Sequence, residues 1–212
     1  MGAHRLALAA DVPADMADGA SLFAIPEDPA ASALCQTAIA LVGERGVAAV
    51  TDDALVARSG GDRRTLDRHF GSAEHCVAAS YQAVADITGA RWEQAVARHE
   101  GFAESLAVAT ADGLVWLSAF PSAGRLLIGD RRAGGPTLVN LRLQTRRRTV
   151  GQLERHYRER IGGPVSTLQL ELLAGAIGQV CTDWLDDGLR ADAASLRDRL
   201  EAVVRCFDPV CA

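Results

Sequence analysis

Hydrophobic residues recur along most of the chain at intervals of three and four positions, which is the spacing of one face of an α-helix. The first such segment follows Asp28-Pro29 and carries Leu34, Ala38 and Leu41 before it reaches Gly46. Aspartate suits the N-cap of a helix, proline its first position and glycine its end. The pattern therefore predicts a helix that begins at Asp28-Pro29 and stops at Gly46.

A shorter, interrupted pattern occupies residues 51 to 70. Thr51 and Asp62 are both suited to cap a helix, and the pair Gly60-Gly61 breaks the chain between them. In the second segment, Leu66 and Phe70 share one face and are expected to point inward. Two short helices joined by a glycine turn form a helix-turn-helix, whose second helix is the kind that enters the DNA major groove.

The polar face of that second helix provides the candidate contacts to DNA bases and phosphates, and Arg64 is the first candidate for a base contact. Four arginines in residues 51 to 70 are matched by four aspartates, so the motif carries no net positive charge. Because phosphate neutralisation supplies most non-specific affinity, we expect weak, salt-sensitive binding unless a dimer focuses the arginines. The candidate DNA-binding residues are Thr51, Arg63, Arg64, Thr65, Arg68 and His69.

Helical patterns continue through the rest of the chain. They predict a flexible N-terminal arm over residues 1–27, a helix-turn-helix domain over 28–75 and a larger helical domain over 76–212. The arm contains Arg5 and His4 without a basic cluster, so a tail is favoured over a minor-groove arm. The further helices are expected at about 72–99, 102–120, 122–132, 137–160, 166–187 and 192–207.

The predicted helix over 166–187 carries apolar side chains on two faces, so one face is expected to cover the protein's own core and the other a second subunit, while the helix over 192–207 keeps one narrow apolar stripe. Gly175 and Gly178 permit close approach of two helices. These helices can pair with their copies as a four-helix bundle, which predicts a homodimer. The candidate interface residues are Leu168, Leu172, Ala176, Val180, Leu196, Leu200, Val203 and Phe207.

The order of these signals from about residue 31 to 84 resembles the N-terminal domain of the tetracycline-repressor (TetR) family of bacterial transcription regulators. The signals are a helix, a glycine, a capped short helix, a glycine turn, Thr65-Leu66, His69-Phe70 and a serine and glutamate at 72 and 74. The resemblance implies an all-α fold, with a three-helix helix-turn-helix domain before a helical ligand-binding and dimerisation domain. It also implies a ligand-responsive regulator, with repression favoured, that binds a palindromic DNA operator as a homodimer.

Three residues depart from the usual family pattern. Gly61 stands where a branched apolar residue is common in the turn, Asp67 where an aromatic is common, and Ala73 where a lysine often contacts phosphate. These departures keep a second interpretation open. In it, the protein is a dimeric module that binds small molecules or proteins, and its degenerate helix-turn-helix binds DNA weakly or not at all.

The resembled family uses the interior of its C-terminal domain to bind a small molecule, so an apolar effector of unknown identity is expected here. Large aromatic side chains are the candidates to contact it, with plain core packing as the competing interpretation. The candidate pocket residues are Trp92, Trp116, Phe120, Tyr157, Gln179 and Trp184.

Composition limits the remaining possibilities. The net charge of −5 over 212 residues argues against a protein coated with cations for nucleic acid, so any DNA contact must be local. The run Arg146-Arg147-Arg148 is interpreted as the solvated face of a helix in preference to an anion site. Five cysteines at scattered positions indicate free thiols in a reducing cytoplasm, with Cys206 beside Arg205 as the only redox candidate.

No signature of catalysis is present in the sequence. It contains no G-x-G-x-x-G after a strand, no Walker loop, no G-x-S-x-G and no H-E-x-x-H, and its five histidines are dispersed. We therefore expect no enzyme activity, no cofactor and no metal site. No apolar stretch reaches membrane-spanning length, so a cytoplasmic protein without membrane contact is expected.

Overall fold

The computed structural model describes residues 28–129, 133–188 and 192–207; the predicted N-terminal arm over 1–27 lies outside these ranges. Within them the chain forms nine α-helices and one short 3-10 helix and contains no strand, which confirms the all-α fold class. The elements are α2 (Pro29–Arg45), η2 (Val47–Ala49), α3 (Asp52–Ser59), α4 (Arg63–His69), α5 (Ala73–Val96), α6 (Phe102–Ser118), α7 (Pro121–Ile128), α8 (Pro136–Arg160), α9 (Thr167–Asp186) and α10 (Ala193–Arg205).

Helix starts follow the capping residues that the sequence predicts. Thr51 caps α3 by accepting a hydrogen bond from the Ala54 amide at 3.2 Å, and Asp62 caps α4 by accepting one from the Thr65 amide at 2.7 Å. Ser166 starts α9 with a full capping box. The predictions for Thr51 and Asp62 are confirmed because capping depends on residues only two or three positions apart.

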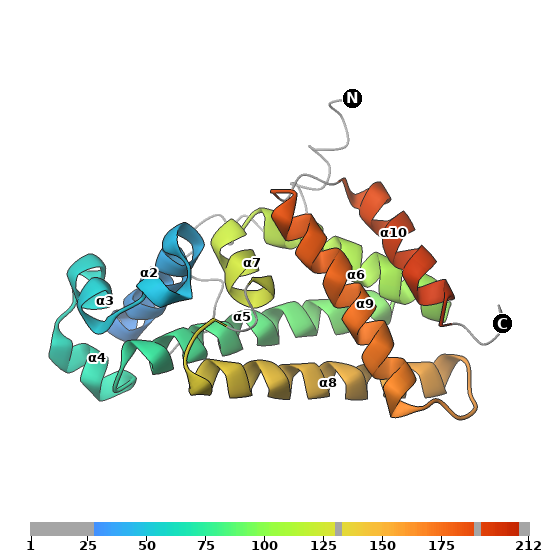
Figure 1. Ribbon diagram of the computed structural model, residues 1–212, viewed down its shortest axis with the longest axis horizontal. Coiled ribbons are helices and arrows are strands. Elements are labelled where there is room, and N and C mark those ends of the chain that lie inside the picture. The colour runs from blue at the N-terminus through green and yellow to red at the C-terminus, as the bar shows by residue number, and fades with distance from the viewer. Residues whose placement is uncertain (1–27, 130–132, 189–191, 208–212) are drawn as a thin grey trace.

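The helices are arranged along one long axis (Figure 1). Helices α2, α3 and α4 form a compact unit at one end, and α5 runs from this unit along the length of the molecule beside α8. Helices α6, α9 and α10 gather toward the other end, while α7 packs against α2. None of the helices in the described ranges combines the length and apolar character that a membrane span requires.

Two hydrophobic clusters hold these helices together. The first begins inside the N-terminal unit at Leu34, Leu55 and Leu66 and continues without a break to Leu126 of α7 and Trp184 of α9. The second lies at the far end of α5 and α8 and includes aromatic and aliphatic side chains from α5, α6, α8, α9 and α10. The first cluster therefore crosses the domain boundary expected near residue 75.

Helix α5 ends at Val96, about three residues earlier than its apolar pattern predicts. The guanidinium of Arg160 donates hydrogen bonds to three backbone carbonyls at this end. The acceptors are Val96 O at 3.0 Å, His99 O at 2.5 Å and Glu100 O at 3.0 Å. These hydrogen bonds satisfy backbone groups that a longer helix would have used internally. A side chain about 60 residues away thus caps the end of this helix, a contact that periodicity alone cannot reveal.

The cysteines in the described ranges are free thiols. Cys35 and Cys76 are buried in the core of the N-terminal unit, whereas Cys206 is exposed at the end of α10 and donates to Ala202 O at 3.2 Å. The buried thiols act as small core residues, as the sequence predicts.

Candidate DNA-binding surface

The turn between α3 and α4 is built from short-range interactions. Gly60 adopts a left-handed conformation with φ of 70°, which ends α3, and the Gly61 amide donates to Ser59 Oγ at 3.2 Å. Leu55 on α3 and Leu66 on α4 are completely buried in the same cluster. Their burial fixes the two helices against α2 and turns the opposite side of α4 toward solvent.

Arg63 is engaged inside this motif. Its Nη2 lies 2.9 Å from Asp52 Oδ2 on α3, and its Nε donates to Asp67 Oδ1 at 2.9 Å one turn along α4. The other oxygen of Asp52 accepts a hydrogen bond from the Ala73 amide at 2.6 Å, at the start of α5. Hydrogen bonding to Asp67 and the nearby carboxylates raise the pKa of Arg63. Arg63 thus connects α4 to α3, and Asp52 extends the link to the start of α5.

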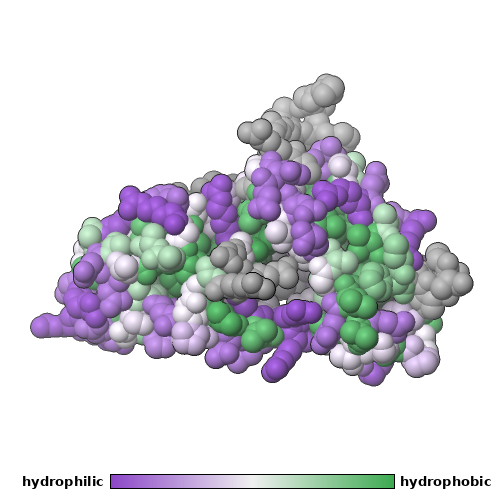
Figure 2. All heavy atoms as spheres, in the orientation of Figure 1, coloured by the Kyte–Doolittle hydropathy of each residue, from purple (hydrophilic) through white to green (hydrophobic). Residues whose placement is uncertain are grey.

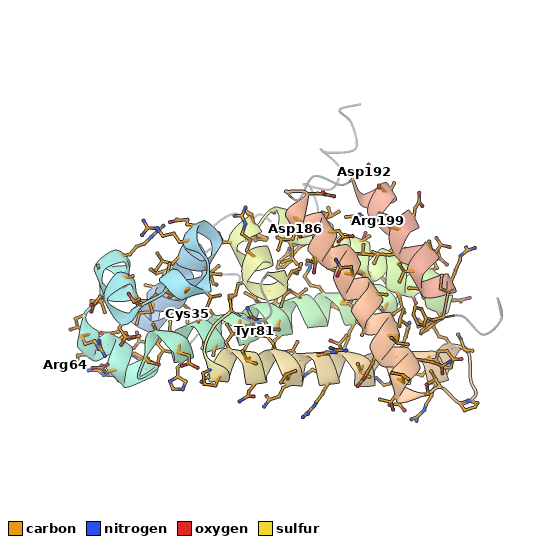
Figure 3. All side chains as sticks on the ribbon, viewed as in Figure 1. Cys35, Arg64, Tyr81, Asp186, Asp192 and Arg199 are labelled. Atoms are coloured by element: carbon orange, nitrogen blue, oxygen red, sulfur yellow. The ribbon has the colours of Figure 1, made fainter. Side chains whose placement is uncertain are left out.

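Arg64 and Arg68 form the cationic part of the outer face of α4. They are four residues apart, so they lie on the same side of the helix, and both are exposed. Figure 3 shows Arg64 at the extreme end of the molecule, directed away from all other helices. Within the ranges that the structure describes, neither guanidinium forms an ion pair. This pair is the best-placed cationic group of the motif for contacts to DNA.

The remaining predicted contact residues are less available. Thr65 Oγ1 donates to Asp62 Oδ1 at 2.8 Å, while Thr51 is exposed and caps α3. His69 is turned toward the start of α2, where its Nε2 lies 3.1 Å from Asp28 Oδ2, although the two groups are not aligned for a hydrogen bond. Four of the six predicted residues, Thr51, Arg63, Arg64 and Arg68, are exposed to solvent, but Arg63 is held in ion pairs and Thr51 caps α3.

Two functional candidates escaped the sequence analysis. In the sequence, Asp52 and Asp67 contribute to the charge balance of residues 51 to 70, and Asp67 also departs from the family pattern. The structure gives Asp52 a bridging role between three helices and leaves Asp67 about half exposed on α4. The four-residue spacing of Arg63 and Asp67 is a sequence signal for their pairing, since such residues are neighbours on a helix.

The arginines of α8 are mostly spread over its solvated side. Arg148 pairs with Asp86 at 2.8 Å and Arg155 with Glu93 at 3.3 Å, both on α5. Arg146 and Arg147 are exposed. This arrangement favours the interpretation of the run as a solvated helix face.

The predicted aromatic pocket residues divide between the two hydrophobic clusters. Trp116, Phe120 and Trp184 belong to the first hydrophobic cluster, whereas Trp92 and Tyr157 belong to the second. Gln179 is exposed and donates to Asp183 at 2.8 Å. The Nε1 of Trp116 is buried and finds no hydrogen-bond partner among the described residues.

Two hollows lie elsewhere on the protein. One, of about 310 Å³, is bounded by η2 and the starts of α5 and α8. The other, of about 510 Å³, lies between the start of α6 and one side of α10. The first is lined by Val47, Ala48, Val50, Glu74, Val77, Gly134, Gly135 and Leu138, and the second by His99, Gly101, Phe102, Ala103, Glu104, Val108, Arg197, Glu201 and Arg205.

The predicted interface residues divide into an exposed and a buried group. Leu168 and Leu172 on α9 are 65% and 55% exposed, and apolar atoms appear at the surface over the start of α9 in Figure 2. Ala176, Val203 and Phe207 are partly exposed. Val180, Leu196 and Leu200 are buried within the protomer itself. The latter three pack α9 and α10 onto their own chain, so the free apolar row is formed by the start of α9.

The arrangement of a three-helix N-terminal unit, a long connecting helix and a helical bundle is the fold of TetR-type transcriptional regulators. The resemblance inferred from residues 31 to 84 is confirmed at the level of the fold by solved structures with low sequence identity. No protein-family model and no curated protein sequence matches the chain.

Three solved proteins illustrate the likeness. The fatty acid degradation regulator FadR of Bacillus halodurans has a TM-score of 0.70 at 14% identity, covering 84% of this chain and 95% of that one. FadR of Bacillus subtilis in complex with stearoyl-CoA has a TM-score of 0.66 at 17% identity, covering 81% and 96%. A TetR-like transcriptional regulator from Rhodococcus has a TM-score of 0.60 at 20% identity, covering 84% and 94%.

Proposed function

We propose that this protein is a ligand-responsive transcriptional regulator that binds a palindromic DNA operator as a homodimer. The observation that carries the proposal is the exposed pair Arg64 and Arg68 on the outer face of α4, the second helix of a helix-turn-helix. A helix in this position can enter the major groove, where arginine donates to guanine and to phosphates. The likeness of most of the chain to solved transcriptional regulators supports the same conclusion.

The proposed dimer forms through the apolar row at the start of α9. Leu168 and Leu172 are large, exposed and one helical turn apart, and Ala176 continues the row with a small side chain. Burying two leucine side chains per protomer is favourable by about 1.5–3 kcal/mol each. A twofold axis at this row relates two copies of α4, which then read the two halves of a palindrome.

The proposed effector is a molecule with an apolar body that binds among helices α5 to α10. Bacillus subtilis FadR was solved with stearoyl-CoA, whose acyl chain has this character. Here the buried indole N–H of Trp116, which lacks a partner among the described residues, is available to donate to one polar atom of such a molecule. Binding that favours one spacing of the two α4 helices would change DNA affinity. We infer repression as the sign of regulation from the resemblance alone.

A selection from random double-stranded DNA at low salt tests the proposal. We expect the protein to enrich a palindrome whose half-sites are about one helical turn apart. The double variant Arg64→Ala, Arg68→Ala should lose this enrichment while keeping the same thermal unfolding, because both side chains are exposed. A dimeric protein that enriches no sequence would instead support the second interpretation, a small-molecule or protein-binding module with a degenerate helix-turn-helix.

A further inference from the structure

The outer face of α4 carries a carboxylate as well as guanidinium groups. Asp67 lies three residues after Arg64, so these two side chains are neighbours on the exposed side of the helix, and Arg68 follows directly in the chain. Its side chain is 52% exposed. A carboxylate in this place repels DNA phosphates. It can therefore favour DNA binding only through a contact to the edge of a base.

The carboxylate of Asp67 is held in a defined position. Its Oδ1 accepts from Arg63 Nε at 2.9 Å, and Arg63 is itself fixed by Asp52, which bonds to the Ala73 amide. Three helices therefore determine the orientation of one acceptor group. Its second oxygen, Oδ2, has no hydrogen-bond partner among the residues that the structure describes. A fixed acceptor with a free oxygen suits the recognition of an amino group.

We propose that Asp67 is a specificity-determining residue that accepts a hydrogen bond from the N4 amino group of a cytosine in each operator half-site. The proposal rests on the proposed function, in which α4 enters the major groove. In that groove aspartate accepts from cytosine, whereas arginine donates to guanine. Arg64 and Asp67 together therefore read one guanine and one nearby cytosine. The oxygen acceptors of guanine and thymine are rejected at the Asp67 position, because two acceptors repel each other.

A simpler role for Asp67 is to neutralise Arg63 and stabilise α4 through a four-residue ion pair. The two roles make different predictions. If Asp67 only neutralises charge, its removal strengthens binding equally for every DNA sequence. If it reads a base, its removal abolishes the preference at one position of each half-site.

The test compares DNA selections by the wild type and the variants Asp67→Ala, Asp67→Asn and Asp53→Ala. Asp53 is an exposed aspartate on α3, so its removal changes the net charge equally outside α4. We expect the wild type to prefer cytosine over the other bases by about fivefold to tenfold at one position, which is the lower part of the range for a good base contact. Asp67→Ala should lose this preference. Asp67→Asn should shift that position toward adenine, which asparagine recognises. Asp53→Ala should retain the wild-type motif.

The outcomes separate the inference from the proposed function. An unchanged motif in Asp67→Ala, with cytosine discrimination equal to that of the wild type, would show that Asp67 does not read a base and would leave the proposed function intact. A wild type that enriches no palindrome would overturn the proposed function, and the inference would fall with it. Thermal unfolding of each variant checks that the helix-turn-helix remains folded.

Discussion

His156 and Arg160 show how single side chains connect distant parts of this protein. His156 is buried, its Nε2 lies 2.9 Å from the Ser105 hydroxyl on α6, and Arg160 Nη1 lies 2.8 Å from its Nδ1. Burial first, and then the charges of Arg160 and Arg155, lower the pKa of His156 to about 4. The imidazole is therefore neutral in the folded protein at neutral pH.

This lowered pKa predicts an acid-sensitive contribution to stability. The unfolded chain binds a proton at His156 below about pH 6.5, whereas the folded protein does so only near pH 4. Stability from this group is complete above the unfolded pKa and decreases as the pH falls from 6.5 toward 4. Chemical denaturation at several pH values should show this loss, and His156→Gln should be less dependent on pH in the same window. Equal dependence in both proteins would assign the effect to other groups.

Arg63 and Arg64 are neighbours in sequence with different expected roles. Arg64→Ala should weaken binding to the cognate operator by about 1–3 kcal/mol and relax one base position, without changing thermal stability. Arg63→Ala removes the links to Asp52 and Asp67, so it should cost up to about 1 kcal/mol of stability. DNA titration followed by fluorescence anisotropy, together with thermal unfolding, measures both effects. Identical profiles for the two variants would contradict this division.

For single residues, the sequence predicts the interactions between residues that are close to each other in the chain. The caps at Thr51 and Asp62 are confirmed because they depend on residues close in sequence. The engagement of Arg63 by Asp52 could not be predicted, since it depends on the angle between α3 and α4. The same holds for His69, whose orientation toward α2 follows from the packing of α4.

Helices α7 and α8 are fitted closely to the N-terminal unit. At the start of α8 the Thr137 amide donates to Glu74 Oε1 at 2.8 Å, beside the first hollow. Arg125 of α7 donates to Gly43 O on α2 at 3.0 Å. A Cβ atom at Gly43 would lie 2.1 Å from Ser122 Oγ and 2.8 Å from Ser122 Cα. Glycine at position 43 thus permits the close approach of α7 to α2.

This close approach predicts opposite effects for two glycine substitutions within helices. Gly43→Ala should destabilise the protein by about 1–3 kcal/mol, because the added methyl group overlaps Ser122. Gly151→Ala on α8 should stabilise it by about 0.5–1 kcal/mol, because no atom lies within 4 Å of the added Cβ and alanine favours a helix. Urea denaturation measures both changes. A stabilised Gly43→Ala variant would show that α7 does not pack tightly on α2.

The sequence predicts the positions of the helices more completely than it predicts which helices pack against each other. Periodicity shows two apolar sides on the helix over 166–187 and one narrow apolar stripe on the helix over 192–207, but it does not show which helix each side meets. Leu196 and Leu200 are completely buried, because α10 packs closely against α6 in the same protomer. The aromatic side chains separate into two clusters for the same reason. Tertiary packing between distant segments decides these positions.

At the scale of the whole molecule, the outer face of α4, proposed to contact DNA, lies far from the apolar row of α9, proposed to form the dimer. Arg64 is at one extreme end, and the start of α9 lies toward the other end of α8 (Figures 1 and 3). Helices α5 and α8 run side by side over much of the distance between them. A change of angle between protomers at α9 would therefore be enlarged at α4.

The assignment of the dimer surface to α9 predicts the effect of charge in its apolar row. The double variant Leu168→Arg, Leu172→Arg should be monomeric, because apposed arginines repel and lose apolar burial. Light scattering should give half the wild-type mass, and affinity for a palindrome should fall. Leu143→Arg is the control, since Leu143 is 51% exposed on α8 instead of α9. If only the control is monomeric, the interface lies on α8.

The unbroken first cluster also matters for attempts to recombine this protein with others. Leu126 of α7 and Trp184 of α9 share a hydrophobic cluster with Leu34 of α2. A fragment cut after residue 75 would expose apolar surface that α7 normally covers, and would tend to aggregate. A chimera that joins the C-terminal helices of another protein to α2, α3 and α4 must therefore keep the native α7. Otherwise the side of α2 that α7 covers must be redesigned.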